Sequence, residues 1–396
     1  MNLRRGMPSG QKDIDGVPDT ASEDGHGEYD VIIVGAGAAG IGVGIAIAHA
    51  GIESLLIVDR ETVGHSFSSW PDETRFITPS FPSNSIGMLD LNSIAIGISP
   101  AFSMRVEHPT GKEYAEHLRD ISEFFELPIR EKTDVINIEK IEGLFHLETK
   151  EETLLAKNVI WAAGEYQYPL LDGFVGSELC RHTSTVPSYN KLEGDDFLII
   201  GGYESGIDAA IHLSNMNKKV RLFDLNAPWL EETSDPSVAL STFSFERMNN
   251  TSFEQNTKLF PNTPVKSVSL EDGVYVLKTQ DDQTFSSTTQ PLLAGGFSGS
   301  HKFVSHLFDE REDGFPELNE SDESTIVPGM FLCGPSVRHD GHIFCFIFKF
   351  RQRFAIVAQA IASSLDIPTD EFVEAYKSWG MYLDDLSCCG QECLTC

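Results

Sequence analysis

The chain has 396 residues, about two to three times the size of an average domain, which leaves room for a large buried core. Its 41% hydrophobic and 22% charged residues are typical of a folded globular protein and exclude a disordered or fibrous one. The formal net charge of −31, from 60 Asp and Glu against 29 Lys and Arg, disfavours binding to nucleic acid or anionic lipid. We therefore expect a multidomain protein that has no nucleic-acid partner.

The first part of the chain favours a cytoplasmic protein without a membrane span. Residues 1–28 are polar, rich in Gly, Asp and Ser, and lack the apolar core of a signal peptide, so we expect a flexible leader. Residues 31–52 carry no Asp, Glu, Lys or Arg, but their regularly spaced glycines favour a buried strand, a tight turn and a close-packed helix. The odd number of cysteines, seven, argues against a secreted disulfide framework.

One sequence plan occurs twice along the chain. In the first copy an apolar run at 29–34 precedes a glycine-rich turn at 35–40, an Ala- and Ile-rich helix, and a strand at 54–58 that ends at Asp59. The second copy repeats this order with a strand at 197–200, a turn at 201–206, a helix to about Met216, and a strand at 219–223 that ends at Asp224.

Each copy continues into a segment with period-2 alternation and turn residues between short apolar runs, at 134–164 and at 264–296. Both segments predict a three-stranded meander that returns to a central sheet. The predicted fold class is therefore α/β, with two Rossmann-like dinucleotide-binding units in tandem and a β-meander in each.

The rest of the chain predicts a surface loop, one strand and two helices. The acidic stretch 309–324 is expected at the surface, and a short strand is expected at 330–332. A long helix is predicted from about His342 to Ser364, and a short amphipathic helix over 369–379.

The first glycine turn is the strongest signal for a ligand. Its G-x-G-x-x-G pattern follows an apolar strand, opens a helix, and has Asp59 at 59 − 40 = 19 residues past the last glycine. Gly35 makes the tight turn, Gly37 lets a pyrophosphate approach the backbone, and Gly40 allows close packing of helix on strand. Asp59 is then expected to accept hydrogen bonds from the ribose hydroxyls.

The second glycine turn departs from this pattern at one position. Gly201, Ser205 and Gly206 match a nucleotide-binding loop, and Asp224 favours an unphosphorylated ribose, but Tyr203 stands where the middle glycine is expected. The tyrosine either caps or gates a working site, or the second unit has lost its nucleotide.

The chain resembles a known superfamily at these turns, at Ala162-Ala163-Gly164 followed by Pro169, and at Phe331-Leu332-Cys333-Gly334. It is similar to the flavoproteins with two dinucleotide-binding domains, the pyridine nucleotide-disulfide oxidoreductase superfamily. Within them it is most similar to flavin-containing monooxygenases and to bacillithiol disulfide reductase-like proteins. The resemblance covers about residues 29–364 and implies FAD in the first unit and NAD(P)H in the second.

The resemblance also implies domain boundaries and site residues. After the leader at 1–28, it implies a discontinuous FAD domain at 29–168 and 291–364, an NAD(P) domain at 169–290, and a C-terminal helix and Cys-rich tail at 365–396. His342 is expected at the start of the helix beside the flavin, with a catalytic role. The implied cofactor-binding residues are Gly35, Gly37, Gly40, Asp59, Arg60, Trp70, Val135, Ala163, Gly164 and Gly334 for FAD, and Gly201, Gly202, Ser205, Gly206 and Asp224 for NAD(P)H.

The last nine residues concentrate four cysteines, Cys388, Cys389, Cys393 and Cys396. The first pair resembles the C-terminal vicinal cysteines of mercuric reductases, and the second pair has the C-x-x-C spacing of redox motifs. Thiolates at this density suit a soft metal ion or reversible disulfide formation, and so a catalytic or metal-binding role. The alternative is a frayed terminus with idle thiols.

Three hypotheses follow. The leading one is a monooxygenase-like, FAD-dependent NAD(P)H oxidoreductase, possible as a homodimer, that acts on a small sulfur- or nitrogen-containing substrate. The second is a thiol/disulfide or soft-metal reductase that uses the tail cysteines. The third is a flavin-containing redox or metal sensor without enzymatic turnover.

Overall fold

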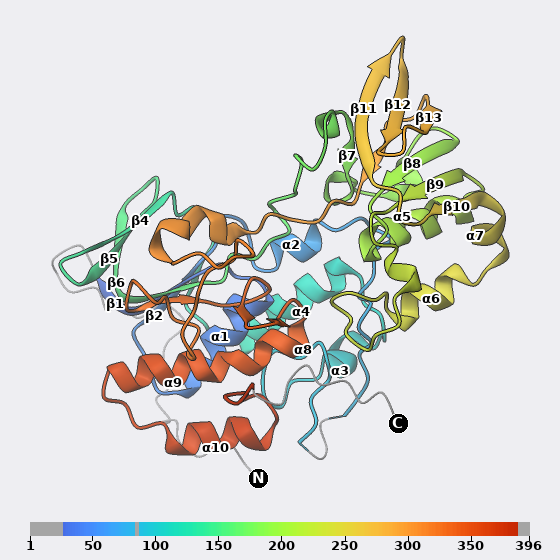
Figure 1. Cartoon of the computed structure of the whole chain (residues 1–396). Coiled ribbons are helices and arrows are strands. Elements are labelled where there is room, and N and C mark those ends of the chain that lie inside the picture. Colours follow the sequence, from blue (N-terminus) through green and yellow to red (C-terminus); the bar gives the residue numbers. More distant parts are fainter. Residues whose placement is uncertain (1–26, 84–86, 387–396) are drawn as a thin grey trace.

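The computed structural model describes residues 27–83 and 87–386. In this part of the chain, two sheets with parallel cores lie in different halves of the molecule, and an antiparallel meander projects from the second half (Figure 1). The predicted α/β class, with two Rossmann-like units and a meander in each, is confirmed.

The first sheet has the strand order β3-β2-β1-β6, and both β5 and β15 pair with β6 on its other side. The side chains of Val31, Ile32 and Ile33 in β1 are fully buried, as expected for a parallel strand covered on both faces. The strands are β1 (Glu28–Val34), β2 (Leu55–Val58), β3 (Ile129–Arg130), β4 (Asn137–Ile141), β5 (Leu144–Glu148), β6 (Thr153–Trp161) and β15 (Met330–Leu332).

The second sheet repeats the parallel part of the first in the order β10-β9-β8-β14-β7. The meander of the second unit forms a separate sheet, and the chain returns to the parallel sheet with β14. In the first unit, β6 belongs to both the parallel sheet and the meander. The strands are β7 (Arg181–His182), β8 (Asp196–Ile200), β9 (Lys219–Phe223), β10 (Thr257–Phe260) and β14 (Leu292–Leu293), with the meander strands β11 (Val265–Glu271), β12 (Val274–Thr279) and β13 (Thr284–Ser287).

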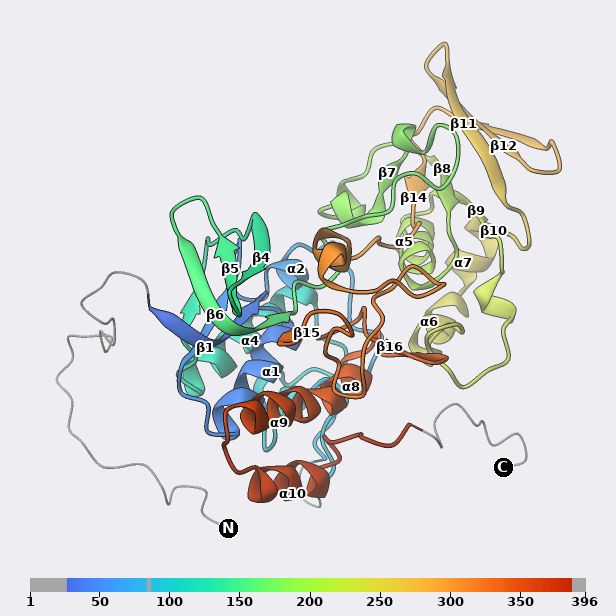
Figure 2. The same cartoon turned by 60° about the vertical axis from the view of Figure 1, so that its left-hand side comes forward.

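The helices cover the sheets and fill the space between the two halves (Figure 2). They are α1 (Ala38–His49), α2 (His65–Ser68), α3 (Pro100–Met104), α4 (Gly111–Phe124), α5 (Glu204–Asn215), α6 (Thr242–Met248), α7 (Thr251–Asn256), α8 (Ile347–Phe350), α9 (Phe354–Ser364) and α10 (Asp370–Ser378).

Helix α1 explains the uncharged stretch at 31–52. All its residues from Ala38 to Ile47 are buried, because the helix packs against the first sheet and against α9. A Cβ at Gly42 would lie 2.1 Å from the Cε2 atom of Phe354, so only glycine allows this approach. No helix in the described residues is long and apolar enough to cross a membrane.

The prediction of a long helix from His342 is wrong for its first residues. Residues Arg338–His339 (β16) and His342–Ile343 (β17) form a hairpin instead, and helical structure begins only at Ile347. Asp340 has a φ of 48°, which Asp tolerates better than most residues, and with Gly341 it connects the two strands.

The stretch 309–324 is not wholly a surface loop either. Asp322 is fully buried, and its carboxylate pairs with the Arg353 guanidinium at 2.8 Å and with the His339 ring at 2.5 Å. This network ties the stretch to the hairpin and to the turn before α9. Lys349 of the following helical segment pairs in the same way with Asp235, at 2.8 Å.

Candidate FAD site and the second glycine turn

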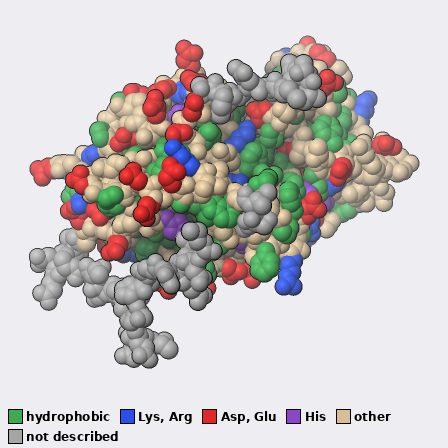
Figure 3. All heavy atoms as spheres, turned by 90° about the horizontal axis from the view of Figure 1, so that it is seen from below, with side chains coloured by type: hydrophobic (Ala, Val, Ile, Leu, Met, Phe, Trp, Pro, Cys, Tyr) green, Lys and Arg blue, Asp and Glu red, His purple; other side chains and the backbone are tan. Residues whose placement is uncertain are grey.

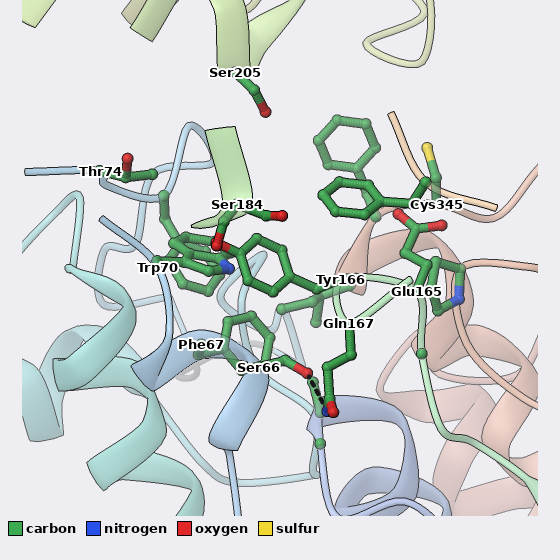
Figure 4. A pocket seen from close by; sticks show the side chains of 18 of the residues that line it. Ser66, Phe67, Trp70, Thr74, Glu165, Tyr166, Gln167, Ser184, Ser205 and Cys345 are labelled. Carbon is green, nitrogen blue, oxygen red and sulfur yellow. Dashed lines mark hydrogen bonds between the residues drawn. The ribbon is translucent and has the colours of Figure 1, made fainter. Parts of the chain in front are cut away.

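A cavity of about 360 Å³ opens where the first glycine turn, α2, the segment after β6, the start of α8 and the first turns of α5 meet (Figure 4). Ser205 reaches it from the second unit, while Glu165 and Cys345 lie at one side. The expected site residues that line it are Gly35, Gly37, Asp59, Trp70, Ala163, Gly164 and Ser205.

A second cavity of about 280 Å³ adjoins the first at Gly35. It is lined by Arg60 and Val135, two further residues expected at the cofactor. Both cavities are lined by Gly35, Asp59, Ala163 and Gln167, so they meet at the start of the glycine turn.

The three glycines of the first turn serve different geometric needs. Gly35 has a φ of +112°, and a Cβ there would lie 2.4 Å from the carbonyl oxygen of Ala162. A Cβ at Gly40 would lie 1.8 Å from the carbonyl oxygen of Gly35. A Cβ at Gly37 would meet nothing within 4 Å, so this position faces open space. That space is where a pyrophosphate can approach the backbone.

Asp59 directly follows β2, and its carboxylate lies beside the first glycine turn. Its Oδ2 accepts a hydrogen bond from the Ala36 N–H at 2.7 Å, and its Oδ1 accepts one from the Glu61 N–H at 2.7 Å. Burial raises the pKa of this carboxyl, while the two backbone N–H groups and nearby His65 and Arg60 act in the opposite direction. Each oxygen keeps a lone pair for a ribose hydroxyl.

Aromatic side chains form one wall of the larger cavity. The ring centroids of Trp70 and Phe76 are 5.0 Å apart, and those of Tyr166 and Phe297 are 5.3 Å apart. Gln167 donates to the Ser66 hydroxyl at 3.2 Å, so α2 and the segment after β6 are joined beside the turn (Figure 4). Such walls favour a flat conjugated ring and exclude water.

Glu165 and Cys345 are the reactive groups of the cavity. Burial raises the pKa of the Glu165 carboxyl, and the Arg338 charge offsets this in part. Burial also raises the pKa of the Cys345 thiol. The Ser237 hydroxyl, 3.2 Å away, and the charges of Lys349 and Arg338 act to lower this pKa. In both groups burial acts against the charged form.

The second glycine turn has nearly the same backbone as the first. Gly201 has a φ of +98°, and a Cβ at Gly206 would lie 1.9 Å from the carbonyl oxygen of Gly201. Asp224 accepts a hydrogen bond from the Gly202 N–H at 2.6 Å, as Asp59 does from the Ala36 N–H. Tyr203 has φ −81° and ψ −169°, close to the −87° and −167° of Gly37.

The two turns differ in what covers them. Gly37 faces open space in the first turn, whereas the equivalent residue of the second turn is Tyr203. The Tyr203 hydroxyl donates to the carbonyl oxygen of Pro236. Trp229 packs over the turn, since a Cβ at Gly202 would lie 2.3 Å from its ring. The chain's own side chains therefore fill the face of the second turn.

The family model for pyridine nucleotide-disulphide oxidoreductases matches residues 32–334, which is most of the chain and includes both turns. The chain belongs to the pyridine nucleotide-disulphide oxidoreductase family. Proteins of this family use FAD and NAD(P)H.

Curated relatives match over part of their length. The CzcO-like oxidoreductase of Geobacillus kaustophilus is 32% identical over 111 residues, 27% of this chain and 32% of that protein. The bacilliredoxin reductase Bdr of Bacillus subtilis is 26% identical over 199 residues, 48% of this chain and 57% of that protein. The chain thus spans about a third to a half of the length of the first relatives it matches.

Solved structures show the same fold at low identity. The bacillithiol disulfide reductase of Bacillus cereus superposes with a TM-score of 0.70 at 19% identity, over 85% of this chain and 100% of that one. A flavin-containing monooxygenase from Stenotrophomonas maltophilia gives a TM-score of 0.68 at 15% identity, over 85% of this chain and 99% of that one.

The two family cofactors fit their glycine turns unequally. The open face at Gly37, the carboxylate of Asp59 and the two cavities beside the turn fit FAD. The face of the second turn does not fit a nicotinamide dinucleotide in this conformation, because Tyr203 and Trp229 occupy it.

The remaining expected residues lie at the edge of the site or outside it. Gly334 has a φ of +108° and packs against Ala39 of α1. His342 lines neither cavity and sits in the hairpin before α8. No group of three or more His, Cys, Asp or Glu that could hold a metal occurs in the described residues. The tail cysteines Cys388, Cys389, Cys393 and Cys396 lie outside the described residues.

The sequence interpretation missed Glu165, Gln167 and Cys345 as cavity residues. Glu165 and Gln167 follow Gly164 directly at the carboxyl end of β6, where ligands of open α/β sheets bind, so their position was a usable signal. Cys345 gave no such signal, because the hairpin before it replaces the expected helix.

Proposed function

We propose that this protein is a monooxygenase-like, FAD-dependent oxidoreductase that passes electrons from NAD(P)H to a small sulfur- or nitrogen-containing substrate. The observation that carries the proposal is the open face of Gly37 on the larger cavity, which shares Gly35, Asp59, Ala163 and Gln167 with the second cavity. The monooxygenase and disulfide reductase folds among the structural neighbours support the class of reaction.

In this proposal the residues around the first turn hold and orient FAD. Gly37 and the N-terminus of α1 receive the pyrophosphate, Asp59 binds the ribose, and Val135 lies at the adenine end. Trp70 and Tyr166 exclude water beside the ring. FAD supplies two-electron redox chemistry, and orientation within the cavity matters more for it than acid–base catalysis.

The side of the cavity opposite the turn is proposed to receive the substrate. Glu165 directly follows Gly164 at the cavity wall, and burial raises the pKa of its carboxyl, so it is the group that we propose to exchange a proton with the substrate. The cavity is largely apolar, which suits a small organic substrate better than a charged macromolecule. Seen from below, the molecule also shows hydrophobic side chains gathered toward its middle (Figure 3).

The test is the visible spectrum of the purified, FAD-loaded protein during anaerobic addition of NADH and, separately, NADPH. We expect the flavin bands to bleach with one of the two nucleotides, and the rate of recovery in air separates oxygen users from reductases. Flavin bands that neither nucleotide bleaches, with or without candidate substrates, would contradict the proposed donor and favour a sensor.

A second candidate function is a thiol/disulfide or soft-metal reductase. The observation that favours it is the Cys345 thiol at the side of the cavity, since Cys180 and Cys333 are buried elsewhere. Truncation after Leu386 and Cys345→Ser separate the two sources of thiol. Reductase activity that survives both changes would contradict any cysteine-dependent mechanism.

We also propose two domains, with the first completed by residues from the end of the chain. Pairing of β15 with β6 supports the discontinuous first domain at 29–168 and 291–364. Because β14 pairs with β8 beyond residue 290, we propose to extend the second domain to Leu293.

A further inference from the structure

A short segment joins the second glycine turn to the wall of the FAD cavity. It consists of Asp235, Pro236 and Ser237, called the strap below, and belongs to the connection between β9 and α6. On one side, the hydroxyl of Tyr203 donates to the carbonyl oxygen of Pro236. The strap is therefore bonded to the side chain that fills the second turn.

On its other side the strap is bonded to the start of α8. The Lys349 Nζ lies 2.8 Å from Asp235 Oδ1 and 2.8 Å from Ser237 Oγ. The Ser237 hydroxyl also lies 3.2 Å from the sulfur of Cys345, which lines the cavity. One chain of contacts thus runs from Cys345 and Lys349 through the strap to Tyr203.

The strap links Tyr203 of the second turn to Cys345 of the cavity wall. Glu204, Ser205 and Asp208 of α5 line the same cavity as Cys345, so the cavity extends to the helix that starts at the second turn. A dinucleotide on that turn, with its nicotinamide toward the cavity, would have to pass Tyr203 and the strap. Both must move before the family's second cofactor can bind there.

The contacts that hold the strap can open. The side chain of Asp235 is 44% exposed and that of Lys349 is 22% exposed, so water screens their ion pair. Tyr203 needs no special backbone, because its φ and ψ match those of Gly37, and its side chain can turn away without refolding of the turn.

We propose that the strap and Tyr203 form a gate over the second dinucleotide site, latched from the cavity side by Lys349. The nicotinamide dinucleotide binds only in the open state, so its apparent affinity is reduced by the fraction of molecules that are open. A cavity ligand that displaces the contacts of Lys349 or Cys345 favours opening. The inference rests on the proposed function for its donor.

The first experiment measures the affinity of the FAD-loaded, full-length protein for NAD⁺ and NADP⁺ by calorimetry. The variants are Lys349→Met, which removes the latch, and Tyr203→Gly, which removes the covering side chain. Lys266→Met is the matched control, since Lys266 pairs with Asp282 on the distant meander. We expect binding to tighten roughly threefold to fivefold for Lys349→Met, by about tenfold or more for Tyr203→Gly, and not at all for the control.

The second experiment locks the gate. Ser237→Cys places a second sulfur beside Cys345, and oxidation with diamide joins the two thiols in a disulfide while diamide takes up the two electrons and two protons. We expect the oxidised variant to lose nucleotide binding and to regain it in dithiothreitol. The unaltered protein, treated in the same way, controls for oxidation of other thiols.

The outcomes separate the gate from the proposed function. Flavin that NAD(P)H bleaches equally well in all variants, with unchanged affinities and no effect of the lock, overturns the gate and leaves the function standing. Bleaching in the unaltered protein that is faster, and needs less nucleotide, in Lys349→Met or Tyr203→Gly supports both. Failure of every variant to bind or to be bleached overturns both.

Discussion

The two glycine turns share a backbone and differ in side chains. In each turn the first glycine has a positive φ, and the last glycine packs against the carbonyl oxygen of the first. In each, a backbone N–H of the turn donates to the aspartate that follows the next strand. Only the first has an open face, at Gly37, whereas Tyr203 fills the second. The backbone of a dinucleotide turn is thus preserved without its binding surface, so fold and ligand are separable properties of this motif.

The largest expected effect comes from giving the first turn the side chain of the second. Gly37→Tyr should weaken FAD binding roughly 100-fold or more, because the ring fills the space for the pyrophosphate. Gly37→Ala is the graded comparison: its Cβ meets no protein atom within 4 Å, so the protein should fold normally and lose less FAD affinity than Gly37→Tyr. The ratio of flavin to protein absorbance measures the effect, and a Gly37→Tyr protein that retains its flavin would contradict the comparison.

The next effect tests whether the two backbones are equally constrained. Gly40→Ala and Gly206→Ala each place a Cβ within 1.9 Å of a carbonyl oxygen, so each should lower the free energy of unfolding by about 3 kcal/mol. Only Gly40→Ala should also weaken the binding of FAD. Chemical denaturation measures the free energy of unfolding, and the release of flavin measures the loss of FAD. A cost confined to one of the two sites would show that the turns are not equivalent.

A smaller effect distinguishes the first unit by its response to acid. Burial lowers the pKa of His117 in α4 to about 4, against 6.5 in the unfolded chain. The unfolded state therefore binds more protons between pH 6.5 and pH 4, and stability falls as the pH drops through this window. At pH 5 the loss is about 2 kcal/mol relative to pH 7.

The control for this pH effect is His117→Gln, which should flatten that part of the profile. The substitution keeps a polar group near the Ser103 hydroxyl, which lies 2.8 Å from the His117 ring in the parent protein. An equally steep profile in the variant would assign the acid sensitivity to another group.

The sequence predicts most of the repeated framework because that framework is local. Gly35, Gly40 and Asp59 lie within one strand-turn-helix-strand unit, and their roles follow from spacing alone. The identity of residue 203 also signalled a change in the second turn. The interaction of Tyr203 with Pro236 was not predictable, because it depends on how an irregular connection folds back.

The errors near the C-terminus have a similar cause. The apolar run after His342 was interpreted as part of one continuous helix, but the Asp340-Gly341 turn and the burial of Asp322 against Arg353 set a hairpin there. Buried ion pairs between distant segments leave no periodic pattern in the sequence. Cys345 enters the cavity only as a consequence of that hairpin.

The pairing of β15 with β6 and the packing of α9 on α1 have a consequence for the order of folding. The first unit is synthesised first, yet its sheet and its helical cover are completed only by residues 330–332 and 354–364. The second sheet, from β7 to β14, is contiguous in the chain and has the shorter loops to close. During synthesis the second unit should therefore reach its native packing while the first still waits for its last strand.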